Sequence, residues 1–489
     1  MPETILLAGI PNLKAILGAV YVVFIVVTIA LIIHDKRDPV KALSWIIVIT
    51  LLPIVGFVLY IVFGRNHRKD KIFNRKELRD IEQLEALTRQ QLYEIHNPAL
   101  MLKSEIDENR DTITLLLNSS KSLLTVHNRL KILNDGVATF DEIIAALENA
   151  RSFIHMEYYI IEDDELGRRI ADILIEKARQ GVEVRLIYDD VGSWGLKKKF
   201  INRLKDAGVD VRCFMRVVFP WLTSKVNYRN HRKIVVVDGE VGFTGGINIA
   251  QRYIDGAEFG QWRDTHLKLE GDAVTMLQVA FMTDWFFVSK EQFDPTDKYL
   301  KKTTVEDECL VQIATSGPDS DWASIMQAFF SAITHAQDHI YISSPYFTPN
   351  EAILTAIKVA ALSGIDVRVM IPNRSDSKVV YWASRSYIGE LLDANVKVYL
   401  YKKGFNHSKL IMIDGQFSSV GTANMDMRSF EDNFEVSAII YDHAITKELE
   451  DTFMEDLAGC REVTREYWNT RPLLHNIYEA FSRLFSPLL

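Results

Sequence analysis

Hydrophobic residues form two long runs at the start of the chain and only short, interrupted runs after it. Residues 13–33 (LKAILGAVYVVFIVVTIALII) contain one charge, and residues 42–63 (ALSWIIVITLLPIVGFVLYIVF) contain none. As a helix, each run is about 30 Å long, which matches the hydrocarbon layer of a membrane. The pattern predicts two transmembrane helices within residues 1–64. A cleaved signal peptide fits the first run poorly, because the run is too long and no basic residue precedes it.

Basic residues gather directly after the second run. Seven Lys and Arg lie between Arg65 and Arg79, against three in the connecting segment 34–41. Since the more basic flank stays in the cytoplasm, we expect a multi-pass protein of the cell membrane with a cytoplasmic body. The basic residues of segment 34–41 leave open a hairpin that does not fully cross. The stretch after the second run either contacts anionic lipid head groups or only sets the orientation.

The rest of the chain has the hydrophobic pattern of α/β domains. Residues 65–120 are predicted to form a basic juxtamembrane segment and a helical connector. After residue 120, short β-branched runs alternate with helical runs, which predicts βα units around a parallel or mixed sheet. The segments QGVEVRLIYDD and SGIDVRVMIPN match each other, which indicates two similar domains. We place these domains at residues 121–305 and 306–489.

The two predicted domains share four polar residues at one spacing. The offset is 176 residues in every case: His231 with His407, Lys233 with Lys409, Asp238 with Asp414, and Asn248 with Asn424. This common offset indicates an internal duplication, packed as a pseudo-twofold tandem repeat. His and Lys are two residues apart before a β-branched run, so they face the same side of a strand. The Asp falls on the other face or at the strand end, and a Gly-rich corner that admits a bound group precedes the Asn.

Two imidazoles and two ammonium groups suit chemistry on a phosphodiester. The ammonium groups and the two Asn amides neutralise the non-bridging oxygens as charge builds in the transition state. One imidazole attacks phosphorus, and the other protonates the leaving alkoxide. The sequence has no HExxH motif, no Cys/His finger, no carboxylate cluster of metal-binding pattern and no P-loop. We therefore expect neither a metal nor another cofactor.

Composition narrows the class of substrate. The chain has 56 Lys and Arg and 65 Asp and Glu, a net charge of −9, and the part after residue 64 carries about −10. An acidic body does not gather polyanions, so nucleic acid is not an expected partner. The three cysteines are widely spaced and form no CxxC pair, which disfavours a disulfide framework or a zinc site.

The segments HRKIVVVD and HSKLIMID both fit the pattern HxKxxxxD of the phospholipase D superfamily. The resemblance extends to bacterial cardiolipin synthases through the paired apolar runs with a basic exit and through four further segments: WRDTHLKLEGDAV, ISSPYFTPN, GTANMDMRSFEDNFEVS and the final FSPLL. It covers almost the whole chain. It implies a transferase that makes cardiolipin and glycerol from two molecules of phosphatidylglycerol, with both lipids as its partners.

The resemblance also implies residue roles. One of His231 and His407 is the nucleophile and the other is the acid and then the base, and the analogy favours His231 as the nucleophile. Four side chains are expected to contact the phosphate: Lys233, Lys409, Asn248 and Asn424. An acidic residue past the Asn is expected to orient each His; Glu435 fits the second copy and Asp264 the first, with Glu258 as a competitor. Asp238 and Asp414 are assigned to holding the site together by hydrogen bonds or ion pairs.

Some alternatives stay open at the level of sequence. The same motifs suit a hydrolytic phospholipase D, a phosphatidyltransferase for another alcohol, or, against the charge, a membrane-anchored nuclease. Residues 213–230 form either a lid or membrane-dipping loop, or a core strand with its loop. The tail 471–489 has one apolar helical face, which either lies on the bilayer or packs on the body, and packing is favoured. Tyr346 and Phe347 line the pocket or belong to the core.

Overall fold

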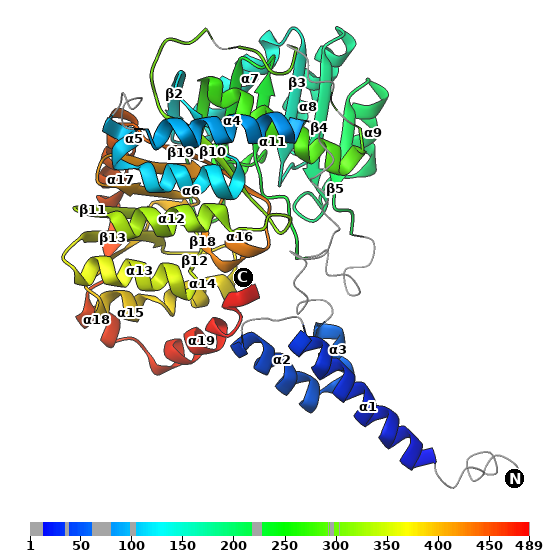
Figure 1. Cartoon of the computed structure of the whole chain (residues 1–489), viewed down its shortest axis with the longest axis vertical. Coiled ribbons are helices and arrows are strands. Elements are labelled where there is room, and N and C mark those ends of the chain that lie inside the picture. Colours follow the sequence, from blue (N-terminus) through cyan, green and yellow to red (C-terminus); the bar gives the residue numbers. More distant parts are fainter. Residues whose placement is uncertain are drawn as a thin grey trace, which may run out of the picture. The chain divides into compact units, whose positions relative to one another are not determined.

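The protein is described by a computed structural model over residues 13–34, 39–60, 80–97, 104–217, 227–291, 293, 298–302 and 304–488 (Figure 1). The chain forms two compact units. One comprises residues 1–67 with 217–227, and the other, called the body here, comprises residues 68–216 and 228–489.

The N-terminal unit contains three helices: α1 (Leu13–His34), α2 (Pro39–Leu51) and α3 (Pro53–Leu59). The first predicted helix corresponds to α1, whereas the second is wrong as one continuous helix. Leu52 leaves the helical conformation with φ −133° and ψ 68°, because Pro53 follows it and restricts its backbone. Within the described ranges, no helix has both the length and the apolar character needed to span a membrane. The predicted basic segment 65–79 lies outside the described residues.

The predicted tandem repeat is present in the body as two sheets of the same topology. The first half has a seven-stranded sheet in the order β2-β9-β7-β6-β3-β4-β5, and the second has a nine-stranded sheet in the order β1-β10-β19-β17-β16-β11-β13-β14-β20. In each sheet three adjacent strands are parallel (β3-β4-β5 and β11-β13-β14) and their neighbours are antiparallel. Both sheets are therefore mixed, one of the two alternatives that the sequence left open.

The strands of the first sheet are β2 (Asn128–Leu133), β3 (Phe153–Tyr158), β4 (Glu183–Asp189), β5 (Asp210–Phe214), β6 (Ile234–Val237), β7 (Val241–Gly245) and β9 (His266–Gly271). Those of the second are β1 (Leu124–Thr125), β10 (Val311–Ser316), β11 (His339–Ser343), β13 (Asp366–Pro372), β14 (Lys397–Tyr401), β16 (Leu410–Ile413), β17 (Phe417–Gly421), β19 (Glu435–Ile440) and β20 (Cys460–Glu462). Residues 213 and 214 thus end a core strand, and residues 218–226 of the predicted lid lie outside the described residues.

Helices surround the two sheets. The first half contributes α7 (Gly136–Asn149), α8 (Glu165–Arg179), α9 (Lys198–Asp206), α10 (Arg252–Asp255) and α11 (Asp272–Ser289). The second contributes α12 (Ser324–His335), α13 (Glu351–Leu362), α14 (Lys378–Arg385), α15 (Ile388–Asp393), α16 (Met427–Glu431), α17 (His443–Leu457), α18 (Arg465–Asn469), α19 (Leu473–Arg483) and the 3₁₀ turn η6 (Ser486–Leu488). Of these helices, α11 and α17 contribute to the core that the sheets share.

The predicted connector packs on the second half. Its helices are α4 (Asp80–Ile95), α5 (Ser104–Glu108) and α6 (Arg110–Ser120). Helices α4, α6, α12 and α13 lie side by side in Figure 1, and Ile113 and Leu117 of α6 share a buried cluster with Phe329 of α12.

A shared core joins the two halves of the body. Val236 and Leu269 of the first sheet, Val436 and Ile440 of the second sheet, and Phe281 of α11 belong to one buried apolar cluster. Burial of this much apolar surface between the sheets fixes their relative position. Loops from both halves can therefore form a single site at the sheet edges.

Candidate active site

The histidine of each HxKxxxxD motif lies in a segment that pairs with the opposite half of the body. The short strand β15 (Gly404–Asn406), just before His407, pairs in parallel with β8 (Gln261–Arg263) of the first half. Asn230, just before His231, forms a parallel bridge with Phe434 of the second half. The backbone N–H of His407 donates to Arg263 O at 2.7 Å, and that of His231 donates to Phe434 O at 2.9 Å. The strands β6 and β16 begin three residues after each His, slightly later than predicted.

This pairing brings each imidazole onto a carboxylate of the other half. His231 Nδ1 lies 2.9 Å from Glu435 Oε2, and His407 Nδ1 lies 2.7 Å from Asp264 Oδ2. The sequence left open which His each acidic residue orients, and in the structure each one contacts the His of the opposite copy. The reason is topological: Glu435 follows Phe434 and Asp264 follows Arg263, the residues that pair with the opposite His segment. The competitor Glu258 is exposed on the surface.

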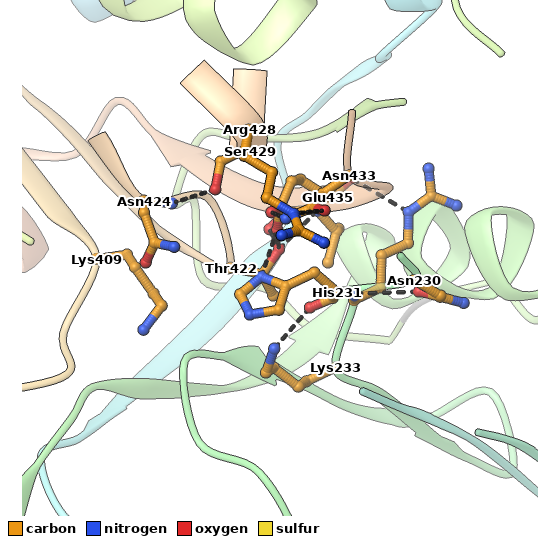
Figure 2. Close-up of polar contacts among 12 residues, drawn as sticks. Asn230, His231, Lys233, Lys409, Thr422, Asn424, Arg428, Ser429, Asn433 and Glu435 are labelled. Atoms are coloured by element: carbon orange, nitrogen blue, oxygen red, sulfur yellow. Dashed lines mark hydrogen bonds and ion pairs between the residues drawn. The ribbon is translucent and has the colours of Figure 1, made fainter. Parts of the chain in front are cut away.

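The carboxylates are fixed by further hydrogen bonds. Glu435 accepts hydrogen bonds from Thr422 Oγ1 and from Asn433 Nδ2, the latter at 3.2 Å (Figure 2). Asp264 Oδ1 accepts from the backbone N–H of Thr265 at 2.8 Å. A carboxylate on Nδ1 sets the imidazole tautomer, so Nε2 carries the lone pair or the transferable proton.

The Gly-rich corner serves the carboxylate. A Cβ atom on Gly246 would lie 2.1 Å from Asp264 Oδ1, so only glycine leaves room for this side chain. The matching position in the second copy is Thr422, whose hydroxyl group donates to the longer Glu435. Gly246 is thus paired with the shorter Asp264 in the first copy, and Thr422 with the longer Glu435 in the second. The sequence predicted that this corner would admit a bound group. At Gly246 the space is occupied by the Asp264 carboxylate instead.

Gly246→Ala is expected to displace Asp264 and to lower turnover at least about 100-fold, because the orientation of His407 depends on that carboxylate. Gly195→Ala is a matched control, since a Cβ there meets no atom within 4 Å. Both variants would be compared by kcat and by the midpoint of thermal unfolding. Normal turnover in Gly246→Ala would contradict the assigned contact.

The two lysines are buried next to the histidines, and the two asparagines line the same cavity. Lys233 Nζ donates to His231 O at 2.6 Å (Figure 2). Lys409 Nζ donates to His407 O. Asn248 Oδ1 accepts from Ile160 N at 3.2 Å. Asn424 is held through its backbone N–H, which donates to Ser429 Oγ at 3.1 Å.

One cavity of about 400 Å³ contains the site. Its lining includes both histidines, both asparagines and Tyr346. It also includes charged residues that are absent from the predicted set: Arg229, Arg252, Asp376, Asp426 and Arg428. Phe347 is buried in the core beside this wall. The two halves therefore supply one common site.

Burial lowers the pKa of both histidines to about 4, so both imidazoles are neutral in the empty site at neutral pH. Burial also lowers the pKa of Lys233 to about 7 and that of Lys409 to about 8. Although burial opposes it, the nearby positive charges hold the pKa values of Glu435 and Asp264 below their ordinary values. The site therefore combines ionised carboxylates, neutral imidazoles and readily deprotonated ammonium groups.

The structure places Asp238 and Asp414 away from this cavity. Asp238 lies in the turn after β6, where its carboxylate accepts from the backbone N–H groups of Arg151, Ser152 and Phe153 at 2.7–2.9 Å. Asp414 holds residues 337–339 in the same way after β16. Both have φ of 54° and precede a glycine, an Asp-Gly pair typical of tight hairpin turns. They fix the start of β3 and of β11 at the far end of the strands, so they do not contact the reacting groups.

Asp238→Ala is expected to destabilise the body by about 3 kcal/mol, because three backbone N–H groups lose their acceptor and alanine disfavours positive φ. Asp238→Asn, which keeps one acceptor and tolerates this φ, should cost less. Thermal unfolding midpoints measure the loss, and kcat per folded molecule should stay unchanged in both variants. A normal midpoint with a large loss of kcat would place the carboxylate in the catalytic path.

Sequence reasoning missed residues that support the site. Tyr253 OH lies 3.2 Å from His407 Nδ1 and accepts from Asn248 Nδ2 at 3.0 Å. Its position in the second copy is Ser429, which holds Asn424. Comparison of the two copies at the offset of 176 residues identifies both positions, and also Thr422. Among the described residues, no group of three or more His, Cys, Asp or Glu is arranged to hold a metal ion.

Comparison with known proteins agrees with the two-motif site. The family model described as "Cardiolipin synthase, PLD-like domain" matches residues 143–267 and 329–457, which contain both histidines. A cardiolipin synthase from a Geobacillus species is 44% identical over 478 residues, covering 97% of this chain and 93% of its own length. One from Staphylococcus aureus is 41% identical, covering 98% and 97%. The chain belongs to the cardiolipin synthase family.

Family membership confirms the predicted enzyme class, a phosphatidyltransferase of the phospholipase D superfamily. Residues 19–65 match a second family model, described as "Phospholipase_D-nuclease N-terminal". Among solved structures, phosphatidylserine synthase from Haemophilus influenzae aligns with 78% of this chain and 100% of its own, with a TM-score of 0.59 and 14% identity. At that identity the match shows the fold alone, and it agrees with the two packed α/β halves.

Proposed function

We propose that the chain makes cardiolipin and glycerol from two phosphatidylglycerol molecules through a covalent phosphatidyl-histidine intermediate. The observation that carries the proposal is the pair of imidazoles in one cavity, each with its Nδ1 atom on a buried carboxylate. This leaves two Nε2 atoms for chemistry on one phosphodiester. Because one diester bond breaks and one forms, the reaction requires no energy-rich cofactor.

In the first step, His231 Nε2 attacks the phosphorus of the first phosphatidylglycerol. A P–N bond forms, the P–O bond to the head-group glycerol breaks, and His407 gives the leaving oxygen its proton. With a pKa of about 4, His407 would carry no proton to donate at neutral pH. A bound phosphodiester anion raises this pKa, since a nearby negative charge favours the imidazolium form.

In the second step, a hydroxyl group of the second phosphatidylglycerol loses its proton to His407 and attacks the same phosphorus. The P–O bond of cardiolipin forms and the P–N bond breaks, which restores neutral His231. Lys233 and Lys409 neutralise the non-bridging oxygens, and the amides of Asn248 and Asn424 donate to them.

The surroundings of the two histidines support His231 as the nucleophile. The carboxylate of Asp376 belongs to the cavity wall and raises the proton affinity of His407, as an acid requires. Arg229 and Arg428 also line the cavity, and the guanidinium group of Arg229 forms an ion pair with the buried carboxylate of Asp189.

We propose further that the N-terminal unit anchors the chain in the cell membrane, with the body in the cytoplasm. Large apolar side chains along α1, α2 and α3 are exposed, among them Val23, Leu51 and Ile54. Such a surface is stable in contact with lipid. The basic residues between Arg65 and Arg79 supply the cytoplasmic bias and a contact for anionic head groups.

Purified full-length protein in detergent, given only phosphatidylglycerol, tests this function. Equal amounts of cardiolipin and glycerol are expected. Phosphatidic acid as the main product would indicate a hydrolase, and a product that requires another added alcohol would indicate a different acceptor. Cleavage of DNA at a comparable rate would indicate a nuclease.

Activity is expected to fall as the pH rises above neutrality. The ammonium groups with pKa values of about 7 and 8 are charged only below those values, and a phosphodiester needs their charge. The neutral histidines, with pKa values of about 4, keep their form down to mildly acid pH. A profile of kcat/KM in detergent should decline on its basic side near pH 7–8. A flat profile up to about pH 9.5 would contradict the role of the lysines.

A further inference from the structure

The C-terminal helix α19 packs on the body through its polar face. Its contact is with α14, and its buried residues are Glu479 and Ser482. Arg471, just before the helix, forms an ion pair with Glu479, and its guanidinium group lies 3.3 Å from the centroid of the Trp468 ring. The favoured prediction, that the apolar face of this tail packs on the body, is therefore wrong: the helix packs, but with the opposite face.

A second ion pair fixes the same orientation at the other end of the helix. Arg483 Nη2 lies 2.6 Å from Glu390 Oε1 of α15, and Nη1 donates to Ser386 O at 3.3 Å. The guanidinium group also lies over the ring of Tyr387, 4.3 Å from its centroid. With both ends held by arginines, rotation of the helix to bury its apolar side would break both ion pairs.

The outward face of α19 is a continuous apolar strip. Its exposed fractions are 74% for Leu473, 60% for Leu474, 54% for Ile477, 61% for Phe481 and 74% for Leu484. The spacing of these residues follows the helical repeat, so they lie on one side. Contiguous exposed apolar surface of this kind marks an interaction site in a soluble body.

The strip is continuous with the rim of the active-site cavity. Ser377 and Val380, at the start of α14, line the cavity, and α14 is the helix that carries α19. On the other side, Arg428 of α16 lines the cavity, and α16 contacts the terminal turn η6. Figure 1 shows α19 and the C-terminus beside α14 and α16. A ligand that covers the strip therefore lies next to the mouth of the site.

Aromatic residues border the strip where α19 meets α14. The ring centroid of Trp382 lies 5.4 Å from that of Tyr478 and 5.0 Å from that of His475. Trp and Tyr side chains are typical of the boundary between lipid head groups and acyl chains. Most of the residues that line the cavity, by contrast, are polar or charged, which suits head groups.

We propose that the exposed face of α19 lies in the lipid–water interface and seats the mouth of the active site on the membrane. The head group of a lipid could then enter the cavity while its acyl chains stay in the bilayer, at the depth of about 5–10 Å that such helices reach. The proposal rests on the proposed function in one respect, because a lipid substrate in the adjoining cavity is part of the argument for lipid as the occupant.

A labelled residue on the strip tests contact with lipid directly. Full-length Phe481→Cys carrying an environment-sensitive fluorophore would be reconstituted in vesicles of phosphatidylglycerol and phosphatidylcholine, some with nitroxide-labelled chains. Val137→Cys, an exposed apolar position on α7, is the control, and wild-type protein gives the background of the native cysteines. We expect quenching about threefold stronger at position 481. Equal quenching at both positions would overturn the proposal, as would a label already shielded in detergent by protein contact or by a second copy.

Activity on two forms of the substrate gives an independent test. The triple variant Leu474→Ser/Phe481→Ser/Leu484→Ser should lose about tenfold in rate on vesicles, and it should keep its rate on short-chain phosphatidylglycerol below its critical micelle concentration. The control triple variant is Val137→Ser/Phe330→Ser/Met454→Ser, which replaces exposed apolar residues on three other helices. An unchanged rate on vesicles, or equal losses on both substrates, would overturn the proposal.

The two tests separate this proposal from the function. If wild-type protein forms no cardiolipin from either substrate, the proposed function fails. The quenching measurement still decides whether α19 contacts lipid, because it does not depend on turnover.

Discussion

His231→Ala and His407→Ala are each expected to lower cardiolipin formation at least about 10⁴-fold, because each removes a group that forms or breaks bonds at phosphorus. The fold should persist in both variants, since the imidazoles lie at the cavity and outside the apolar clusters. Product analysis with labelled phosphatidylglycerol, together with thermal unfolding midpoints, measures both expectations. Substantial activity in either variant would refute a shared site.

A donor with a good leaving group separates the two roles. Phosphatidyl-p-nitrophenol needs no acid to release p-nitrophenolate, so His407→Ala should give a burst of about one equivalent and then stop. His231→Ala should give no burst, because the P–N bond cannot form. The reverse pattern would make His407 the nucleophile and leave the rest of the mechanism intact. A burst in both variants, or in neither, would contradict a single covalent histidine.

The exchange of carboxylates between the halves predicts the next largest effects. Glu435→Gln should impair the step that depends on His231, and Asp264→Asn the step that depends on His407. Each should lower turnover roughly 10²–10³-fold, because the imidazole loses the partner that sets its tautomer and orientation. With phosphatidyl-p-nitrophenol, Glu435→Gln should slow the burst, whereas Asp264→Asn should spare it and slow only the later transfer. Asp238→Asn, a carboxylate of the same chain away from the cavity, is the control and should leave both phases normal.

The opposite assignment would be informative. If Glu435→Gln spared the burst and Asp264→Asn abolished it, each carboxylate would serve the His of its own copy. The contacts at 2.9 Å and 2.7 Å across the halves would then not describe the working enzyme.

Much of the site could be predicted from sequence because its chemistry repeats. The common offset of 176 residues identifies both His-Lys pairs, both Asn residues and both Asp-Gly turns, and a fully buried strand follows each pair. Family resemblance then supplied Glu435 and Asp264. The sequence also predicted two similar α/β halves, since the pattern of β-branched and helical runs is local.

Features that depend on packing could not be predicted in this way. The pairing of Asn230 with Phe434 and of β15 with β8 is set by how the two sheets meet, so the exchange of carboxylates has no signature in either copy alone. The orientation of α19 is marked by the ion pairs of Arg471 with Glu479 and of Arg483 with Glu390, which the apolar periodicity of the helix does not reveal. The break at Leu52 is a different case, because it follows from Pro53, a local signal within an otherwise apolar run.

The crossed contacts make the two halves dependent on each other. Neither half holds a complete imidazole–carboxylate couple, so a chain with a single copy of the motif would need a second, identical molecule to form one. With two copies in one polypeptide, the couples need not be identical: one has Asp264 opposite Gly246 and the other Glu435 opposite Thr422.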